Sequence, residues 1–365
     1  MLADHEYQFE RFPRNSDRSL QAWDAADEYL YEHCRQQDIS SLLIYNDSFG
    51  FLSLTLSAKN MLTTSDSACT RKAISNNARL NSLREPATCH LGEASGSFDH
   101  IIIKMVKSLD LLAYEVAQAS RLLSPEGVII LSGMSKHIHT STIKLFEKYF
   151  HTVNTSLAKK KARLLFASGP KEDKRVLSGM PPAQSMTYKG LEICSHPGVF
   201  SSGKIDGGTK LLLETLPEPE SSDTIIDLGC GNGIIGITLA KYHTMKKVIF
   251  SDDSFLAIQS TKENWVRNIE SSIQAEFLVQ HSLQDIPEDS VDMVVSNPPY
   301  HQGFTNTQQI AISFFNDAQR VLKKGGSFWV VANNHLGYIQ ELDRLFSHAS
   351  MVTKNSAYTI YRAVK

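Results

Sequence analysis

The strongest constraint on the fold is an outline that the sequence contains twice. Residues 224–240, TIIDLGCGNGIIGITLA, form an apolar run, a glycine-rich turn and the start of an apolar helix. Residues 41–57, SLLIYNDSFGFLSLTLS, repeat that outline, with Gly50 opposite Gly233. A repeat of this kind constrains the fold before any single motif does. We therefore predict an internal duplication of one structural unit.

Other landmarks recur in the same order along the chain. Asp99 in FDHIIIK lies opposite Asp292 in VDMVVSN, and Arg121 lies opposite Arg320 near the end of a predicted helix. In the second copy, apolar strand patterns alternate with helical ones up to SFWVVAN. Such alternation predicts an α/β fold with parallel, doubly wound sheets, which bind ligands at the carboxyl ends of their strands. We expect two tandem Rossmann-like domains.

The boundary between the copies is predicted from composition. The segment 167–185, ASGPKEDKRVLSGMPPAQS, is rich in Gly, Pro, Ser and charged residues, as linkers are. We place the first domain at 1–170, the linker at 171–185 and the second domain at 186–365.

The two copies differ where a ligand would bind. Asp227–Gly233, DLGCGNG, becomes IYNDSFG in the first copy, so two of three glycines are lost. Asn297-Pro298-Pro299-Tyr300 becomes Lys104-Met105-Val106-Lys107. We interpret the N-terminal copy as degenerate, a scaffold without its ligand site.

Composition excludes several classes of protein. The formal net charge is −2, so nucleic acid would have to be bound by a local patch, and no stretch has the roughly 18 consecutive apolar residues of a membrane helix. The first residues lack an export-signal pattern, and five scattered cysteines without a CxxC pair fit reduced thiols and no metal site. We expect a cytoplasmic protein. Its best basic patch contains four residues: Lys159, Lys160, Lys161 and Arg163.

The glycine turn of the second copy suits a nucleoside ligand. Gly229, Gly231 and Gly233 let a ligand approach the backbone, and the following helix directs its N–H groups toward that ligand. Asp252 or its neighbour Asp253 ends the next strand, where a carboxylate can accept hydrogen bonds from ribose hydroxyls. The turn alone could also belong to a nicotinamide or flavin site, or be only a tight turn.

Three more features favour one class of protein. The spacing is GxGxG rather than GxGxxG, and Asp227, just before the glycines, is well placed for an amino acid ammonium group. The fourth strand ends in Asn297-Pro298-Pro299-Tyr300. Together these motifs resemble the class I methyltransferases, whose cofactor is S-adenosylmethionine, and among them the enzymes that methylate a planar nitrogen.

The chemistry of that reaction explains the residues. The lone pair of a planar nitrogen is delocalised, so the nitrogen is a poor nucleophile. The Asn297 side-chain oxygen and the Pro298 carbonyl can accept hydrogen bonds from its NH2 group and favour a more tetrahedral nitrogen. Pro299 stiffens the turn, and Tyr300 would stack on the flat target. Catalysis would then rest on positioning and electrostatics.

The whole chain resembles the ribosomal RNA guanine-N2 methyltransferases. Residues 188–217, with PGVFS and DGGT, are similar to the segment that closes over cofactor and target in that family. Residues 11–30, RFPRNSDRSLQAWDAADEYL, resemble the large-subunit (23S) enzymes of the RlmG type rather than the small-subunit RsmC type. The resemblance implies N2-methylation of a guanine in 23S rRNA, which gives N2-methylguanosine.

The resemblance also assigns roles to residues. It implies cofactor contacts at these positions: Asp227, Gly229, Gly231, Gly233, Asp252 and, at the adenine, His281. The target nitrogen would meet Asn297, Pro298, Pro299 and Tyr300. RNA would be bound by the basic patch and by the covering segment: Lys159, Lys160, Lys161, Arg163, Phe200, Ser201 and Asp206.

Other activities share parts of these motifs. Glutamine-amide methylation of a protein such as a release factor uses NPPY, although such enzymes usually carry a small helical bundle at the N-terminus. A DNA adenine methyltransferase would bring a separate base-recognition domain. A non-catalytic RNA-binding factor is the third alternative. We expect a monomer that acts on protein-free or partly assembled rRNA, with neither DNA nor a membrane as partner.

Overall fold

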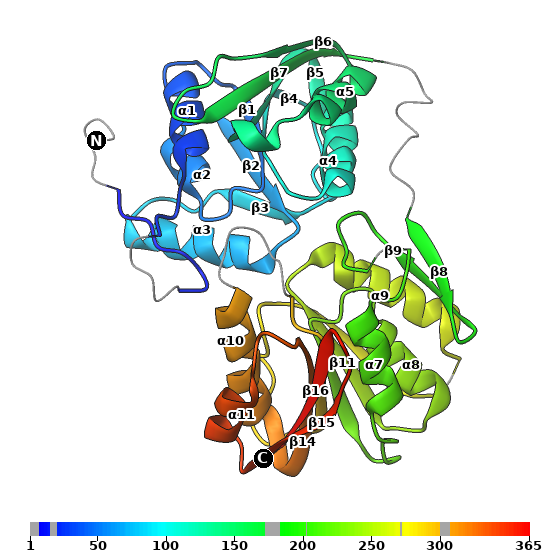
Figure 1. Ribbon diagram of the computed structural model, residues 1–365. Helices are drawn as coiled ribbons and strands as arrows, with labels where there is room; N and C mark the ends of the chain where they lie inside the picture. The colour runs from blue at the N-terminus through cyan, green and yellow to red at the C-terminus, as the bar shows by residue number, and fades with distance from the viewer. Residues whose placement is uncertain (1–6, 15–19, 172–182, 202, 271, 300–306) are drawn as a thin grey trace. The chain divides into compact units, whose positions relative to one another are not determined.

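The computed structural model describes residues 7–14, 20–171, 183–201, 203–270, 272–299 and 307–365. The chain divides into two compact units, Met1–Pro182 and Ala183–Lys365. Each unit is an α/β domain with a central sheet flanked by helices (Figure 1). In the described parts of the chain, no helix has both the length and the apolar character needed to cross a bilayer.

In the described residues, the first unit has a seven-stranded sheet with the order β3-β2-β1-β4-β5-β7-β6. Its strands are β1 (Ser41–Tyr45), β2 (Asn60–Ser65), β3 (Ala87–His90), β4 (Phe98–Lys104), β5 (Leu123–Met134), β6 (Phe150–Thr155) and β7 (Ala162–Pro170). Its α-helices are α1 (Ala25–Cys34), α2 (Phe51–Thr55), α3 (Ala68–Leu80), α4 (Leu109–Leu122) and α5 (Thr140–Tyr149).

The second unit repeats this topology, with the order β12-β11-β10-β13-β14-β16-β15. Its strands are β10 (Thr224–Leu228), β11 (Lys247–Asp252), β12 (Gln274–Val279), β13 (Val291–Ser296), β14 (Leu322–Asn333), β15 (His348–Lys354) and β16 (Tyr358–Val364). Its helices are α7 (Gly207–Thr215), α8 (Ile234–Tyr242), α9 (Phe255–Asn268), α10 (Thr307–Val321) and α11 (Ile339–Leu345). A hairpin of β8 (Gln184–Tyr188) and β9 (Leu191–Ser195) precedes them. The predicted duplication of an α/β unit is confirmed.

The paired aspartates have the same structural role in both copies. The Asp99 carboxylate accepts a hydrogen bond from the Ser41 amide (2.7 Å) at the start of β1. The Asp292 carboxylate accepts one from the Thr224 amide (2.9 Å) at the start of β10. Each aspartate lies where the register between the fourth and fifth strands shifts. The two residues therefore anchor the central strands of their sheets in the same way.

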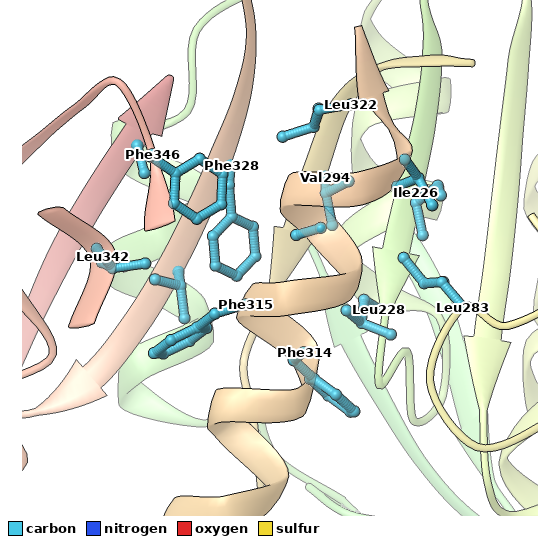
Figure 2. Close-up of a cluster of buried hydrophobic side chains, with 14 of the residues drawn as sticks. Ile226, Leu228, Leu283, Val294, Phe314, Phe315, Leu322, Phe328, Leu342 and Phe346 are labelled. Carbon is cyan, nitrogen blue, oxygen red and sulfur yellow. The ribbon is translucent and has the colours of Figure 1, made fainter. Parts of the chain in front are cut away.

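The second sheet is buried on both faces, as a parallel sheet requires. Ile225 packs in the core beneath α7, α8 and α9, whereas its neighbour Ile226 packs toward α10 and α11. Figure 2 shows the second of these cores, with Phe314 and Phe315 on α10 and with Val294 beside them. Val294 is fully buried in this core, so its packing holds β13 and the residues that follow its carboxyl end in position.

Candidate active site

The glycine turn joins β10 to α8. All three of its glycines have positive φ: 68° at Gly229, 57° at Gly231 and 80° at Gly233. A Cβ at Gly233 would lie 2.6 Å from Thr261, so only glycine fits there. A Cβ at Gly231 would meet nothing within 4 Å. Gly231 therefore borders open space, as a backbone that receives a ligand should.

Asp227 lies at the base of this turn and is almost fully buried (1% exposed). Its Oδ2 accepts a hydrogen bond from the Gly236 amide of α8 (2.9 Å), whereas its Oδ1 has no partner. Burial raises the pKa of the Asp227 carboxyl to about 8; the Gly236 amide opposes this shift and Asp252 adds to it. A cationic group next to Oδ1 would stabilise the carboxylate and partner this buried oxygen.

Asp252 ends β11 beside the same turn. Its Oδ2 accepts a hydrogen bond from the Gly231 amide (2.9 Å), and its Oδ1 accepts one from the Ser254 amide (2.9 Å). The carboxylate therefore lies against the glycine turn at the carboxyl end of the sheet, where a nucleoside would bind. Asp253 follows it directly and is likewise half-buried.

His281 follows the third strand of the second sheet, β12. Burial lowers the pKa of His281, and Asp253 and Asp317 oppose that shift. The next residue, Ser282, has a positive φ of 61° and donates its hydroxyl to Asp317. The half-buried imidazole of His281 therefore precedes a residue with left-handed backbone, Ser282, whose hydroxyl is hydrogen-bonded to Asp317 of α10.

Asn297 follows β13 directly and lies next to the glycine turn. In the pairing of the strands, Ser296 faces Leu228, and the Ser296 hydroxyl donates to the Leu228 carbonyl (2.8 Å). The next residues along these two neighbouring strands are Asn297 and Gly229. The Asn297 side chain is therefore at the same sheet edge as the turn and Asp252.

The Asn297 carboxamide has one defined orientation. Its Nδ2 donates to the Asp206 carboxylate (3.2 Å) and to the Thr209 hydroxyl (2.8 Å), both at the start of α7. A carboxylate only accepts hydrogen bonds, so the NH2 group must face Asp206. The oxygen, Oδ1, then points the other way, and it is buried without a partner. The site thus holds an unused acceptor.

Asp206 is itself fixed by three groups. It is the N-cap of α7, and its Oδ2 accepts hydrogen bonds from the amides of Gly208 (2.9 Å) and Thr209 (3.1 Å). The Tyr358 hydroxyl of β16 donates to its Oδ1 (3.4 Å). The sequence places Asp206 only in a covering segment, and it gives no indication that Thr209 and Tyr358 belong to the site. An Asp before Gly-Gly-Thr is an N-cap signal that could have located the α7 contact.

The remaining residues of the motif have different environments. Pro298 is buried and Pro299 is half-buried, while Tyr300 is outside the described residues. In the covering segment, Phe200 is 58% exposed. Ser201 has a φ of 64°, and its hydroxyl donates to the Lys204 carbonyl (2.6 Å). Phe200 therefore presents an aromatic surface to solvent from a tight turn.

The basic patch of the first unit is partly neutralised. Lys159 forms an ion pair with Glu32, and Lys160 forms one with Glu28 (2.8 Å), both on α1. The hydrogen bond from Lys160 to Glu28 raises the pKa of the Lys160 ammonium. Lys161 has a φ of 65°, and nearby the Nε of Arg163 is buried without a partner. Two of the four cations thus already have carboxylate partners.

The donor set of this site suits an organic ligand. Within the residues that the structure describes, no group of three or more His, Cys, Asp and Glu side chains lies together as a metal site would require. The buried free oxygens of Asp227 and Asn297 and the open space over Gly231 instead fit an organic cationic cofactor and an NH2-bearing target.

The second unit is therefore the catalytic domain of a class I methyltransferase, defined by its strand order, its glycine turn and the Asn-Pro-Pro end of β13. Comparison with known proteins agrees. Residues 1–171 match the family model "RLMG N-terminal domain" and residues 190–362 match "Methyltransferase small domain".

The curated relatives define the family more closely. The chain is 37% identical to the ribosomal RNA large subunit methyltransferase G of Photobacterium profundum, over all of this chain and 98% of the relative. It is 36% identical to the enzyme of that name from Colwellia psychrerythraea, over 97% and 96% of the two chains. The chain belongs to the ribosomal RNA large subunit methyltransferase G family, so it is an S-adenosylmethionine-dependent methyltransferase.

A solved structure shares the whole architecture. The T. thermophilus 16S rRNA N2 methyltransferase RsmC, determined with AdoMet and guanosine, superposes with a TM-score of 0.76. The match covers 94% of this chain and 92% of RsmC at 22% identity. The tandem arrangement of two such domains thus has a counterpart in a solved protein.

Proposed function

We propose that the protein transfers a methyl group from S-adenosylmethionine to the exocyclic N2 of one guanine in 23S rRNA. The observation that carries this proposal is the buried, unpartnered Oδ1 of Asn297, held at the carboxyl end of β13 beside the glycine turn. The large-subunit substrate is supported by the names of the full-length relatives. Its product is N2-methylguanosine.

The cofactor would be held by residues of the second unit. Bound S-adenosylmethionine supplies a methyl group that its sulfonium makes electrophilic. Asp227 offers a buried carboxylate oxygen to a cationic amino group. Gly229, Gly231 and Gly233 leave the backbone open, and Asp252 and His281 border the nucleoside end. These residues bind and orient; none of them is required to take part in bond making.

Asn297 acts on the target nitrogen. Its Oδ1 accepts one hydrogen of the guanine NH2 group, and the Pro298 carbonyl accepts the other. These bonds draw the nitrogen toward a tetrahedral geometry and direct its lone pair out of the ring plane. On accepting the methyl group that the cofactor would supply, the nitrogen would become positive and its hydrogens would bind these acceptors more strongly. One of these hydrogens would then leave as a proton to give neutral N2-methylguanosine. The site is therefore most complementary to the transition state.

Asp206, Thr209 and Tyr358 position that acceptor. Because Asp206 can only accept hydrogen bonds, it prevents the carboxamide from rotating by 180° and presenting its NH2 group to the target. The negative charge of Asp206 also polarises the carboxamide, which strengthens Oδ1 as an acceptor. The Thr209 hydroxyl and the Tyr358 hydroxyl complete this network. Asp206 thus acts through Asn297.

The target base has to leave its stack to reach this site, since a paired guanine hides its N2 group. In this proposal the exposed Phe200 and its neighbour Ser201 contact RNA, and Tyr300, which lies outside the described residues, stacks on the target base. We infer that the protein acts as a monomer in the cytoplasm on protein-free or partly assembled rRNA. The four cations Lys159, Lys160, Lys161 and Arg163 remain candidates for phosphate contacts.

The test is transfer of labelled methyl from S-adenosylmethionine to four acceptors in parallel. They are protein-free large-subunit rRNA, protein-free small-subunit rRNA, duplex DNA and a purified release factor. Digestion of labelled RNA to nucleosides identifies the product. Label in N2-methylguanosine from large-subunit RNA alone supports the proposal. Label in DNA or in the release factor would keep the planar-nitrogen chemistry and overturn the substrate.

A further inference from the structure

A second basic site lies in the first unit, away from the lysine run. Residues 8–12 pass along α3, where a pocket of about 340 Å³ is lined by eight residues. The lining residues are Glu10, Arg11, Phe12, Arg14, Asn76, Asn77, Arg79 and Leu80. Three guanidinium groups and a single carboxylate give this pocket a net positive charge.

The guanidinium groups of the pocket are only partly used. Arg11 donates its Nε to the Gln21 carbonyl (2.9 Å) and lies over the Phe49 ring, but its Nη1 is buried without a partner. Arg14 pairs with Glu10 (3.0 Å), and both side chains are well exposed. Arg79 is exposed and has no carboxylate within ion-pair distance among the described residues. The pocket therefore has donor capacity that its own carboxylate does not satisfy.

The last carbonyls of α3, near Arg79, are partly paired within the chain. Asn81 and Ser82 donate backbone amides to the Asn77 and Arg79 carbonyls (3.2 and 3.1 Å). The Asn81 Nδ2 also donates to the Asn77 carbonyl (2.8 Å). Several of the helix's last carbonyls are thus paired locally.

The pseudo-symmetry of the chain shows that these arginines are specific to the first copy. Asn77 and Asn81 bind the backbone of residues 8–10 as Asn264 and Asn268 bind that of β9. In this correspondence, Arg14 lies opposite Gly198 and Arg79 opposite Val266. The catalytic copy has no charge at either place. The copy that lost its glycines carries two exposed guanidinium groups instead.

We propose that the pocket of Arg11, Arg14 and Arg79 binds a phosphate of the RNA substrate. The proposal rests on the proposed function for the identity of the RNA. A phosphodiester matches the planar fork of a guanidinium group, and each neutralised phosphate releases condensed counterions. Arg11 is held in place by Gln21 and Phe49 and supplies the buried donor, whereas Arg14 and Arg79 supply the exposed charge.

The experiment measures binding of protein-free large-subunit rRNA by the full-length protein at salt concentrations from about 50 to 200 mM. The test variant is R14Q/R79Q, which leaves Arg11 and the fold intact. The matched control is K144Q/K148Q, which removes the same charge from two exposed lysines of α5 in the same unit. Both proteins are compared with wild type for RNA affinity, cofactor affinity and methyl transfer at saturating RNA.

We expect R14Q/R79Q to raise the Kd for RNA about tenfold at low salt and to flatten the salt dependence by a slope of about 0.7 to 0.9, the share of one phosphate contact. Its cofactor affinity and its rate at saturating RNA should match wild type, and K144Q/K148Q should bind RNA within about twofold of wild type. RNA affinity of R14Q/R79Q equal to that of the control would overturn the proposal. Because binding is measured apart from methyl transfer, wild-type protein that binds but does not methylate this RNA would instead count against the proposed function.

Discussion

The two copies show how one fold keeps its structure while losing a site. Gly50 and Gly233 begin the helix after the first strand with nearly the same φ, 82° and 80°. A buried aspartate accepts the same helix amide in each copy, but it comes from different positions. Asp47 accepts from the Ser53 amide (2.8 Å), and Asp227 accepts from the Gly236 amide (2.9 Å). Both copies therefore place a buried acceptor here, and of the two aspartates Asp227 is the one with an unpartnered oxygen.

The end of the fourth strand is where the copies diverge. Asn297 contacts the first turn of α7 and has a spare acceptor. At the same place in the first copy, the ammonium of Lys104 pairs with Asp27 of α1 (2.7 Å). Burial alone would lower the pKa of Lys104, but the nearby acids Asp27, Asp47 and Asp24 together outweigh it and raise that pKa. The first copy therefore has, at the position of Asn297, a cation that is paired within its own fold.

The side chains beside the turn also differ between the copies. In the second copy, Phe314 of α10 packs against Gly229. In the first copy, Glu115 of α4 accepts a hydrogen bond from the Asn46 side chain (2.7 Å). Asn46 has a positive φ (63°), as Gly229 does, but unlike Gly229 it has a side chain, and this side chain donates to Glu115. The side chains at the strand ends therefore differ between the copies, while the strand order and the φ values of Asn46 and Gly229 match.

The largest expected effect comes from Asn297→Ala. Loss of a positioned acceptor should lower kcat by about 10² to 10³, because its bonds strengthen in the transition state. Cofactor affinity should stay within about twofold of wild type, since in the proposed mechanism Asn297 binds the target and not the cofactor. Single-turnover methyl transfer and a calorimetric titration separate the two. A comparable loss of cofactor affinity would show that Asn297 has been assigned the wrong role.

The equivalent change in the first copy, Lys104→Ala, should have the opposite profile. It leaves Asp27 buried without its partner, which costs about 3 kcal/mol of unfolding free energy. At a temperature where the variant stays folded, kcat should equal that of wild type. Denaturant unfolding and initial-rate assays measure the two effects. A tenfold loss of kcat in folded Lys104→Ala would mean that the first copy takes part in catalysis.

Asp206→Asn tests whether Asp206 fixes the orientation of the Asn297 carboxamide. Asparagine is as good an N-cap as aspartate, so α7 should be preserved. The new side chain can also donate, so the Asn297 carboxamide loses its single orientation and kcat should fall about tenfold. KM for S-adenosylmethionine should not change. Asp206→Ala serves as the comparison, because it removes cap and orientation together. Unchanged kcat in Asp206→Asn with intact α7 would exclude the positioning role.

A smaller effect concerns pH. Burial raises the pKa of Glu115 and of Asp227 to about 8 in the folded protein, while the unfolded groups titrate near 4. The folded state therefore holds protons that the unfolded state has released, and its stability should fall as the pH rises from about 4 toward 8. Glu115→Gln or Asp227→Asn should each flatten this slope in thermal unfolding of the cofactor-free protein. If stability changed with pH by the same amount in both variants and in wild type, this assignment of the pH dependence to Glu115 and Asp227 would be wrong.

The sequence predicts those parts of the structure that are determined by patterns within a short stretch of the chain. The alternation of strands and helices, the glycine turn and the Asp99–Asp292 correspondence follow from periodicity and from residues with one structural use. The contact between Asp206 and Asn297 joins residues 91 positions apart, so no local pattern contains it. The pairing of the lysine run with α1 acids, over more than 120 residues, was missed for the same reason.

The most direct test compares wild type with Asn297→Ala on protein-free large-subunit rRNA, with labelled S-adenosylmethionine and nucleoside analysis of the product. We predict label in N2-methylguanosine for the wild-type protein and its loss in the variant, which still binds the cofactor. Label in another nucleoside, or transfer by Asn297→Ala at the wild-type rate, would contradict the assignment of the second copy's unused acceptor as the group that receives the guanine N2 hydrogens.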